Sequence, residues 1–244
     1  MKLASAKNRI IFPLDFASLG EALKSVSLLK NHVGVFKIGL ELFTACGPEA
    51  VKAVKEKAPG VPIFLDMKFH DIPATVKGAM KSAAGLGVEF ITVHCDEGRG
   101  LLKAVAEAGA GKTKVLGVTV LTSLSGADLT EIGIDPKYKT PADLVLHRAR
   151  LARLAGCAGV VCSGQEADAV REEFGRDFLI VTPGIRSATD DVGDQKRIVT
   201  PYDAIYSGAD YIVVGRPIRN AKDPLIAAEE IAKEIERAIE NRGG

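Results

Sequence analysis

The chain has 244 residues, of which 47% are hydrophobic and 26% are charged, and its formal net charge is +1. This balance is typical of a globular protein and excludes a disordered or fibrous chain. Acids and bases are interspersed without a basic stripe, so nucleic acid is not expected as a partner.

Eight short apolar runs alternate with segments of helical periodicity along the chain. The apolar runs are residues 10–14, 35–38, 63–65, 90–93, 115–121, 159–162, 178–181 and 211–214. The helical segments are residues 19–29, 50–57, 74–86, 101–108, 142–154, 167–174, 202–207 and 225–239. Runs of Val and Ile without polar alternation are typical of parallel strands buried on both faces. The repeat predicts an α/β protein, a TIM (β/α)8 barrel formed as a single domain over residues 1–244.

A doubly wound open sheet is the competing architecture for the same alternation. It is disfavoured because eight units fit within this length and because no GxGxxG motif follows the first apolar run. The segments 109–112 and 125–128 are expected to be surface turns.

The cysteines and the apolar segments indicate where in the cell the protein is expected. Cys46, Cys95, Cys157 and Cys162 form neither a CxxC pair nor a zinc pattern, so we expect buried, reduced thiols. No segment approaches the roughly 18 apolar residues that cross a membrane, and the first residues contain no apolar stretch of signal-peptide length. We therefore expect a cytoplasmic protein without a membrane partner.

Polar side chains gather where the predicted strands end, which is where a barrel enzyme places its catalytic groups. The residues at or near these ends are Asp15, Lys37, Asp66, Lys68, His94, Asp96, Thr122, Ser123, Arg186 and Arg216. Side chains alternate along a strand, so Asp66 and Lys68 are expected on one face. A buried ion needs a partner, so the two residues either compensate each other at the wall of a cavity or form a plain ion pair that caps the strand.

The loops after the seventh and eighth runs suit a phosphate group. Gly184 precedes Arg186, and Gly215 precedes Arg216; glycine admits an anion close to backbone N–H groups, and arginine offers a planar fork. The other interpretation is a pair of turn glycines beside surface arginines. Between these two loops, residues 187–197 form a long polar segment. We interpret it either as a lid that folds over the phosphate, with Gln195 holding it closed, or as a mobile surface insertion.

The motif Asp66-x-Lys68-x-x-Asp71-Ile72-Pro73-x-Thr75 carries a family resemblance. Together with Asp15, Lys37 and the sequences Pro-Gly-Ile-Arg at 183–186 and Val-Gly-Arg-Pro at 214–217, it resembles the bacterial orotidine 5′-monophosphate decarboxylases. The resemblance extends over residues 10–219 and implies conversion of orotidine 5′-monophosphate to uridine 5′-monophosphate, the last step of de novo pyrimidine nucleotide synthesis.

The resemblance also implies catalytic roles. Lys68 would donate a proton to C6 of the pyrimidine, Asp66 would lie beside the leaving carboxylate, and Lys37 would join the charged array and hold ribose hydroxyls. Asp71 and Thr75 would reach into the site of a neighbouring subunit, which makes the expected assembly a homodimer. His70, which lies between Asp66 and Asp71 in the sequence, is expected to have a structural role.

The remaining implied contacts hold the substrate. The pyrimidine ring would contact Thr122 and Ser123, and a ribose hydroxyl would contact Asp15. Gln195 and Arg216 would bind the phosphate. Arg186 and Gly215 would line the same end.

No cofactor or metal is expected. The sequence offers no recognisable site for an electron-sink cofactor. Asp66, Asp71, His94 and Asp96 could ligate a cation, but neighbouring lysines would compete with it. Instead, the two lysines and two aspartates of the set Lys37, Asp66, Lys68 and Asp71 would stabilise one another's charges.

Two alternatives stay open at this point. One is a magnesium-dependent sugar-phosphate decarboxylase or synthase of the same superfamily, which shares the Asp-x-Lys-x-x-Asp core. The other is a non-catalytic barrel that binds nucleotides, although a binding module has no need of a clustered proton donor.

Overall fold

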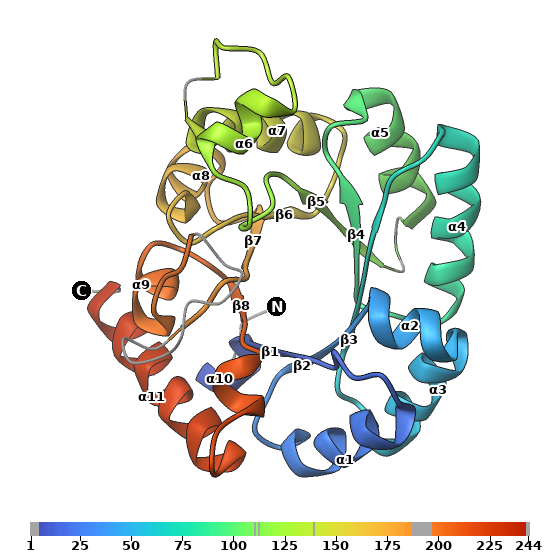
Figure 1. Cartoon of the computed structure of the whole chain (residues 1–244), viewed down its shortest axis with the longest axis vertical. Helices are drawn as coiled ribbons and strands as arrows, with labels where there is room; N and C mark the ends of the chain where they lie inside the picture. Colours follow the sequence, from blue (N-terminus) through green and yellow to red (C-terminus); the bar gives the residue numbers. More distant parts are fainter. Residues whose placement is uncertain (1–4, 110, 112, 139, 187–196, 243–244) are drawn as a thin grey trace.

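Parallel strands close into a barrel at the centre of the molecule (Figure 1). The computed structural model describes residues 5–109, 111, 113–138, 140–186 and 197–242. In this part of the chain the strands are β1 Ile10–Pro13, β2 Val35–Gly39, β3 Ile63–Phe69, β4 Phe90–His94, β5 Lys114–Val118, β6 Gly159–Val161, β7 Leu179–Thr182 and β8 Tyr211–Val213. Each strand pairs with the next, and β8 pairs with β1. The predicted barrel is confirmed, and the open sheet is excluded.

Helices surround the barrel on its outer side (Figure 1). The predicted helices are found as α1 Leu19–Leu29, α3 Pro48–Lys57, α4 Pro73–Gly85, α5 Gly98–Gly109, α7 Pro141–Leu154, α8 Ala167–Phe174, α9 Pro201–Tyr206 and α11 Pro224–Arg242. The sequence did not predict the 3-10 helix η1 Ala6–Arg9 or the short helices α2 Leu40–Cys46, α6 Gly126–Glu131 and α10 Arg216–Arg219. None of the helices in the described ranges is long and apolar enough to span a membrane.

Local sequence explains where α1 begins and which face it buries. The side chain of Ser18 accepts a hydrogen bond from the backbone N–H of Glu21, which satisfies one of the free donors of the first turn. Ala22, Val26 and Leu29 follow at helical spacing and are buried against the barrel.

The interior of the barrel is filled at one end by its own side chains. Residues from seven strands form this inner layer: Ile11, Val35, Phe64, Phe90, Leu116, Val181 and Tyr211. The ring of Phe90 packs edge-on between Phe64 and Tyr211, at centroid distances of 6.0 and 5.3 Å. Because this end is filled, the space for a ligand lies toward the carboxyl ends of the strands.

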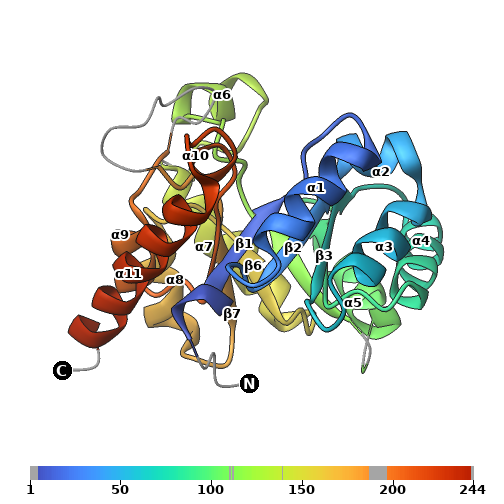
Figure 2. The same cartoon turned by 90° about the horizontal axis from the view of Figure 1, so that it is seen from below.

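Figure 2 shows α6 and α10 at one end of the barrel, with α11 running from there toward the other end. Helix α10 directly follows β8, so this end carries the loops that follow the strands. The turn predicted at residues 125–128 is wrong, because Ser125 and Asp128 form a reciprocal capping box that starts α6. The prediction for the fifth strand also extended too far, because β5 ends at Val118.

Candidate active site

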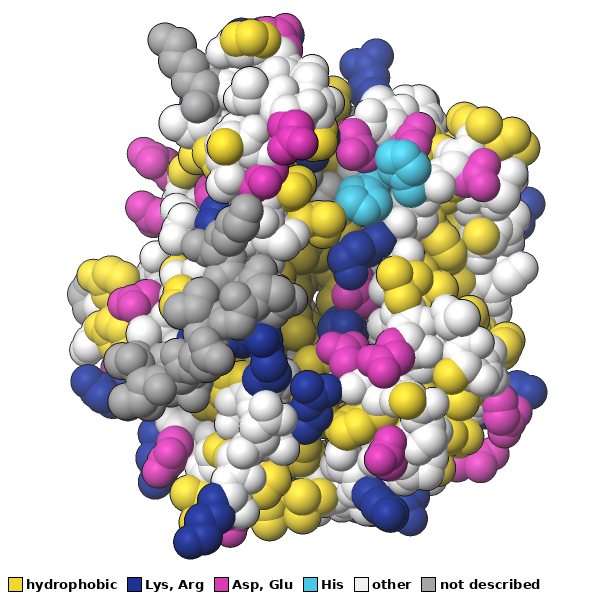
Figure 3. Space-filling view, viewed as in Figure 1, with side chains coloured by type: hydrophobic (Ala, Val, Ile, Leu, Met, Phe, Trp, Pro, Cys, Tyr) yellow, Lys and Arg dark blue, Asp and Glu magenta, His cyan; other side chains and the backbone are white. Residues whose placement is uncertain are grey.

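A cavity of about 560 Å³ opens at the carboxyl ends of the strands. Figure 3 shows the hollow, with lysine, arginine, acidic and histidine side chains around its mouth. The polar lining residues are Asp15, Lys37, Glu41, Asp66, Lys68, Thr122, Ser123, Arg186, Arg216 and Arg219. The floor includes Phe64 of the inner aromatic layer, so the cavity rests directly on the packed core.

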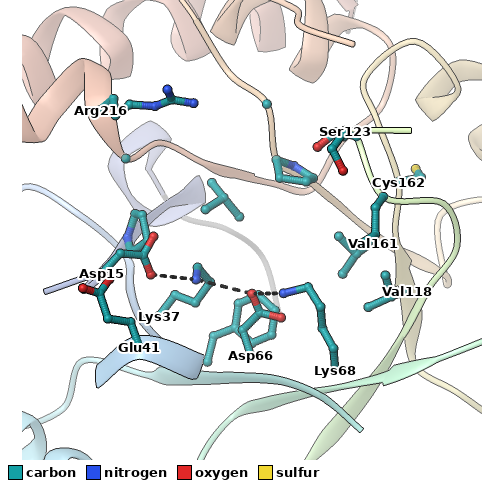
Figure 4. Close-up of a pocket in the computed structure, with 18 of the residues that line it drawn as sticks. Asp15, Lys37, Glu41, Asp66, Lys68, Val118, Ser123, Val161, Cys162 and Arg216 are labelled. Carbon is teal, nitrogen blue, oxygen red and sulfur yellow. Dashed lines mark hydrogen bonds and ion pairs between the residues drawn. The ribbon is translucent and has the colours of Figure 1, made fainter. Parts of the chain in front are cut away.

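Four side chains in this cavity form a chain of alternating charge (Figure 4). The Nζ atom of Lys37 lies 3.3 Å from Oδ1 of Asp15 and 3.3 Å from Oδ2 of Asp66. The same Asp66 oxygen lies 2.8 Å from Nζ of Lys68. The set is neutral as a whole, so each buried ion has an oppositely charged neighbour.

Asp66 is held at both carboxylate oxygens. While Oδ2 faces the two lysines, Oδ1 accepts a hydrogen bond of 2.9 Å from the hydroxyl of Thr92 on β4. Burial is the largest influence on the pKa of Asp66 and acts to raise it, but Lys37, Lys68 and Thr92 together lower it below its ordinary value. Asp66 is therefore a fixed negative charge between two ammonium groups.

Lys37 is the buried centre of the chain. Burial is the largest influence on its pKa and acts to lower it, yet Asp66 and Asp15 outweigh burial and raise the pKa above its ordinary value. Lys37 is thus a permanent cation at neutral pH, and a ligand that enters the cavity meets it already charged.

The position of Lys68 depends on an irregularity in β3. Its φ is 49°, and the pairing with β4 shifts between Leu65 and Phe69. The backbone N–H of Lys68 donates to Oγ1 of Thr92 at 2.8 Å instead of to a strand carbonyl. Asp66 and Lys68 meet in the cavity, as predicted, although the strand that carries them is irregular between Leu65 and Phe69.

Asp71 and Thr75 lie apart from this chain of charges. Both are exposed, and neither lines the cavity of its own chain. The carboxylate of Asp71 accepts a hydrogen bond of 2.6 Å from the backbone N–H of Ile72. Within one chain the fourth charged member is therefore Asp15 and not Asp71.

Across the cavity lie the groups predicted for a phosphate. Arg186, Gly215 and Arg216 line it, and Figure 4 shows Arg216 on the side away from Lys68. Gly184 has φ 77°, a left-handed conformation that favours glycine, in the turn that leads to Arg186. Gln195 and residues 187–196 of the predicted lid lie outside the residues that the structure describes.

Thr122 and Ser123 also line the cavity, although they lie beyond the end of β5. Sequence reasoning missed Glu41 and Arg219. Glu41 lies in the first turn of α2, a helix that was not predicted. Arg219 donates a hydrogen bond of 2.8 Å to the backbone oxygen of Asp15, and its spacing of three residues from Arg216 would have placed both on one helical face.

One cluster beside the cavity has the atoms of a metal site. Ligand atoms of His70, His94 and Asp96 lie within 4.8 Å of one another. His70 bridges Asp96 at 3.4 Å and Glu97 at 2.8 Å, while the second oxygen of Asp96 lies 3.4 Å from Arg148. These contacts give each of the carboxylates a partner, which agrees with a structural role for His70.

Comparison with known proteins identifies relatives over nearly the whole chain. Residues 8–231 match the family described as orotidine 5′-phosphate decarboxylase / HUMPS. The orotidine 5′-phosphate decarboxylase of Desulfosudis oleivorans is 47% identical over 242 residues, which cover 98% of this chain and 97% of the relative. The enzyme of the same name from Moorella thermoacetica is 46% identical and covers 95% of this chain and 93% of its own.

A solved structure extends the likeness to the fold. The crystal structure of orotidine 5′-phosphate decarboxylase from Lactobacillus acidophilus superposes with a TM-score of 0.79 at 39% sequence identity. The superposition covers 93% of this chain and 98% of that one.

Proposed function

This chain belongs to the orotidine 5′-phosphate decarboxylase / HUMPS family, and we propose that it decarboxylates orotidine 5′-monophosphate with Lys68 as the proton donor to C6. The product is uridine 5′-monophosphate, so the reaction is the last step of its de novo synthesis. The observation that carries the proposal is the charge chain Asp15–Lys37–Asp66–Lys68 at the mouth of the barrel, which ends in a lysine beside open space.

The chemistry to be catalysed is an electrostatic problem. Loss of carbon dioxide from C6 leaves a lone pair in the plane of the ring, where the π-system delocalises it poorly. An ammonium group held in place before the reaction stabilises this charge without rearrangement and then transfers its proton. Lys68 meets both requirements, because Asp66 fixes its Nζ at 2.8 Å on the cavity wall.

Asp66 has a second role in this proposal. We place the substrate carboxylate beside it, where the two negative charges repel each other until carbon dioxide leaves. Thr92 prevents Asp66 from turning away, because it holds the other carboxylate oxygen at 2.9 Å. We rank this repulsion behind the stabilisation of the carbanion by Lys68.

The rest of the nucleotide spans the cavity. The ribose hydroxyls contact Asp15 and Lys37, and the pyrimidine edge contacts Thr122 and Ser123. The phosphate binds Arg216 at the opposite end, next to Arg186 and Gly215, and Gln195 completes this contact. Remote binding of this kind contributes to the chemical step when it orients the reacting atoms.

We also propose a homodimer in which Asp71 and Thr75 complete the site of the neighbouring subunit. Both side chains are exposed in one chain and do not reach their own cavity. Between them lies Ile72, an isoleucine that is 66% exposed, as expected for a residue that a partner covers. A cytoplasmic location is supported by the four cysteines, all of which are free thiols.

Release of carbon dioxide from orotidine 5′-monophosphate by the purified protein tests the proposal directly. The main alternative is a magnesium-dependent reaction of a sugar phosphate, and the names of the relatives favour the nucleotide reaction. A protein that leaves the nucleotide unchanged but acts on a sugar phosphate would refute the proposal.

A further inference from the structure

Behind the wall of the cavity lies a buried arginine that the proposed mechanism does not use. Arg197 has a side chain that is 7% exposed, and its Nη1 atom lies 2.6 Å from Oε1 of Glu166, which is 4% exposed. An ion pair this deep loses the hydration of both charges, so burial alone does not make it a strong source of stability.

The second arm of the guanidinium supports the loop that follows β5. Nη2 of Arg197 donates to the carbonyl oxygens of Val120 at 3.0 Å and Leu121 at 3.1 Å. Since β5 ends at Val118, strand pairing no longer holds these carbonyls; that of Leu121 also accepts a hydrogen bond of 3.0 Å from the N–H of Leu124, within its own loop. The next two residues along the chain are Thr122 and Ser123, which line the cavity.

The geometry of the Arg197–Glu166 pair indicates that Arg197 positions the backbone, because the pair is not arranged to stabilise the fold as strongly as it could. Nε of Arg197 and Oε2 of Glu166 are buried without a hydrogen-bond partner within the described ranges. By contrast, Arg150 uses two nitrogens to bind both oxygens of Glu173 at the surface. Arg197 contacts its carboxylate through Nη1 alone and donates from Nη2 to the backbone.

Arg197 is also tied to the neighbouring loop. Its backbone oxygen accepts a hydrogen bond of 3.4 Å from Oγ of Ser163, which follows β6, and Glu166 lies three residues further on. The guanidinium therefore links the loop after β6 to the loop after β5. Burial raises the pKa of Glu166 despite the opposing effect of Arg197. The contact therefore carries a desolvation cost for the carboxylate.

We propose that Arg197 is a positioning residue for recognition of the pyrimidine base. By fixing the backbone of residues 120–121, it sets where Thr122 and Ser123 stand against the base edge. This inference rests on the proposed function, and it concerns the base and not the phosphate. Figure 4 shows Ser123 well separated from Asp15 across the cavity, so a shift of this loop would change one end of the ligand site only.

The chain offers a matched control at the opposite end of the barrel. Arg171 is similarly buried, pairs with Asp210 at 2.6 Å, and donates to the carbonyl oxygens of Phe178 at 3.0 Å and Gly208 at 2.9 Å. These acceptors precede β7 and β8, far from the cavity mouth. Arg171→Met thus removes the same kind of buried network without touching the proposed base contacts.

The test compares two ligands in the full-length protein by calorimetry: uridine 5′-monophosphate, and ribose 5-phosphate, which lacks the base. We expect Arg197→Met to weaken binding of the nucleotide about tenfold, the effect of losing one well-aligned polar contact, and to leave ribose 5-phosphate within about twofold. Arg171→Met should lower thermal stability and leave both affinities unchanged. Arg197→Lys, which keeps the charge but not the fork, should weaken nucleotide binding in the same selective way if the Met variant does not fold.

The outcomes separate this inference from the proposed function. Unchanged nucleotide affinity in both Arg197 variants, or equal weakening of both ligands, would overturn the positioning role alone. Wild-type protein that binds ribose 5-phosphate but not uridine 5′-monophosphate would overturn the proposed function together with it.

Discussion

The ammonium of Lys68 lies 2.8 Å from a carboxylate oxygen of Asp66, and the backbone reaches this position through a left-handed residue. A φ of 49° at a lysine costs about 1–2 kcal/mol relative to ordinary strand geometry. Thr92 compensates in part, because its hydroxyl accepts from the Lys68 N–H and donates to Asp66. The fold thus accepts local strain to place the proposed proton donor.

Replacement of Asp66 by Asn should destabilise the protein by about 3 kcal/mol at neutral pH, because Lys68 would lose the carboxylate that it pairs with and Lys37 would keep only that of Asp15. Urea unfolding measures the difference. The exposed variant Asp135→Asn, which breaks a surface pair with Lys137, is the control and should change little.

The contribution of the Asp66–Lys37 pair to the stability of the wild type has a defined pH dependence. The folded-state pKa of Asp66 is lowered, so its contribution is present above the ordinary value of 3.8 and is lost as the pH falls through the lower folded value. The folded-state pKa of Lys37 is raised, so its contribution is present below 10.5 and is lost as the pH rises through the higher folded value. In the wild type, the joint contribution of Asp66 and Lys37 to stability should therefore be constant from about pH 5 to pH 9. A marked slope within this range would contradict the assigned ionisation states.

Arg216→Ala should reduce kcat/KM for orotidine 5′-monophosphate about a hundredfold, because a charge-assisted contact with the phosphate is lost. Turnover of orotidine, which lacks the phosphate, should change less than about twofold because that contact is never made. Steady-state kinetics on both substrates measure the effect, with Arg237→Ala on the exposed face of α11 as the control. Equal losses on both substrates would rule out a phosphate role.

Mixing inactive Asp71→Ala and Lys68→Ala chains should restore activity if the site is shared between subunits. A heterodimer would contain one intact site, so random exchange should recover about a quarter of the wild-type activity. Differently tagged chains verify the exchange. Heterodimers that form but remain inactive would show that Asp71 does not act across the interface.

Much of the barrel could be predicted from the sequence because its signals are local. Helix α1 was predicted with its observed bounds from its helical periodicity, and the Ser18 cap found in the structure lies at the predicted start. Helix α6 was missed because a capping box and a surface turn use the same residue types, and Ser125 was assigned to the turn.

The site was harder to predict where it depends on contacts between distant segments. The strand that carries Asp66 and Lys68 has a register shift against β4 and a left-handed residue, neither of which the β3 sequence reveals. Arg197 joins the loops after β5 and β6 from a separate part of the chain, so no spacing rule would find it. Glu41 was missed together with the short helix α2 that carries it.

The most direct test of the central claim is the ultraviolet absorbance of orotidine 5′-monophosphate incubated with purified protein in the presence of EDTA. We expect the wild type to form uridine 5′-monophosphate, and Lys68→Ala to be slower by about 10⁴-fold because it lacks both the cation and the proton. The control Lys114→Ala removes another strand lysine paired with a carboxylate, Glu89 at 2.6 Å, and should remain active. Undiminished turnover by Lys68→Ala, or a folded wild type that is inactive here but converts a sugar phosphate once magnesium is added, would contradict the account.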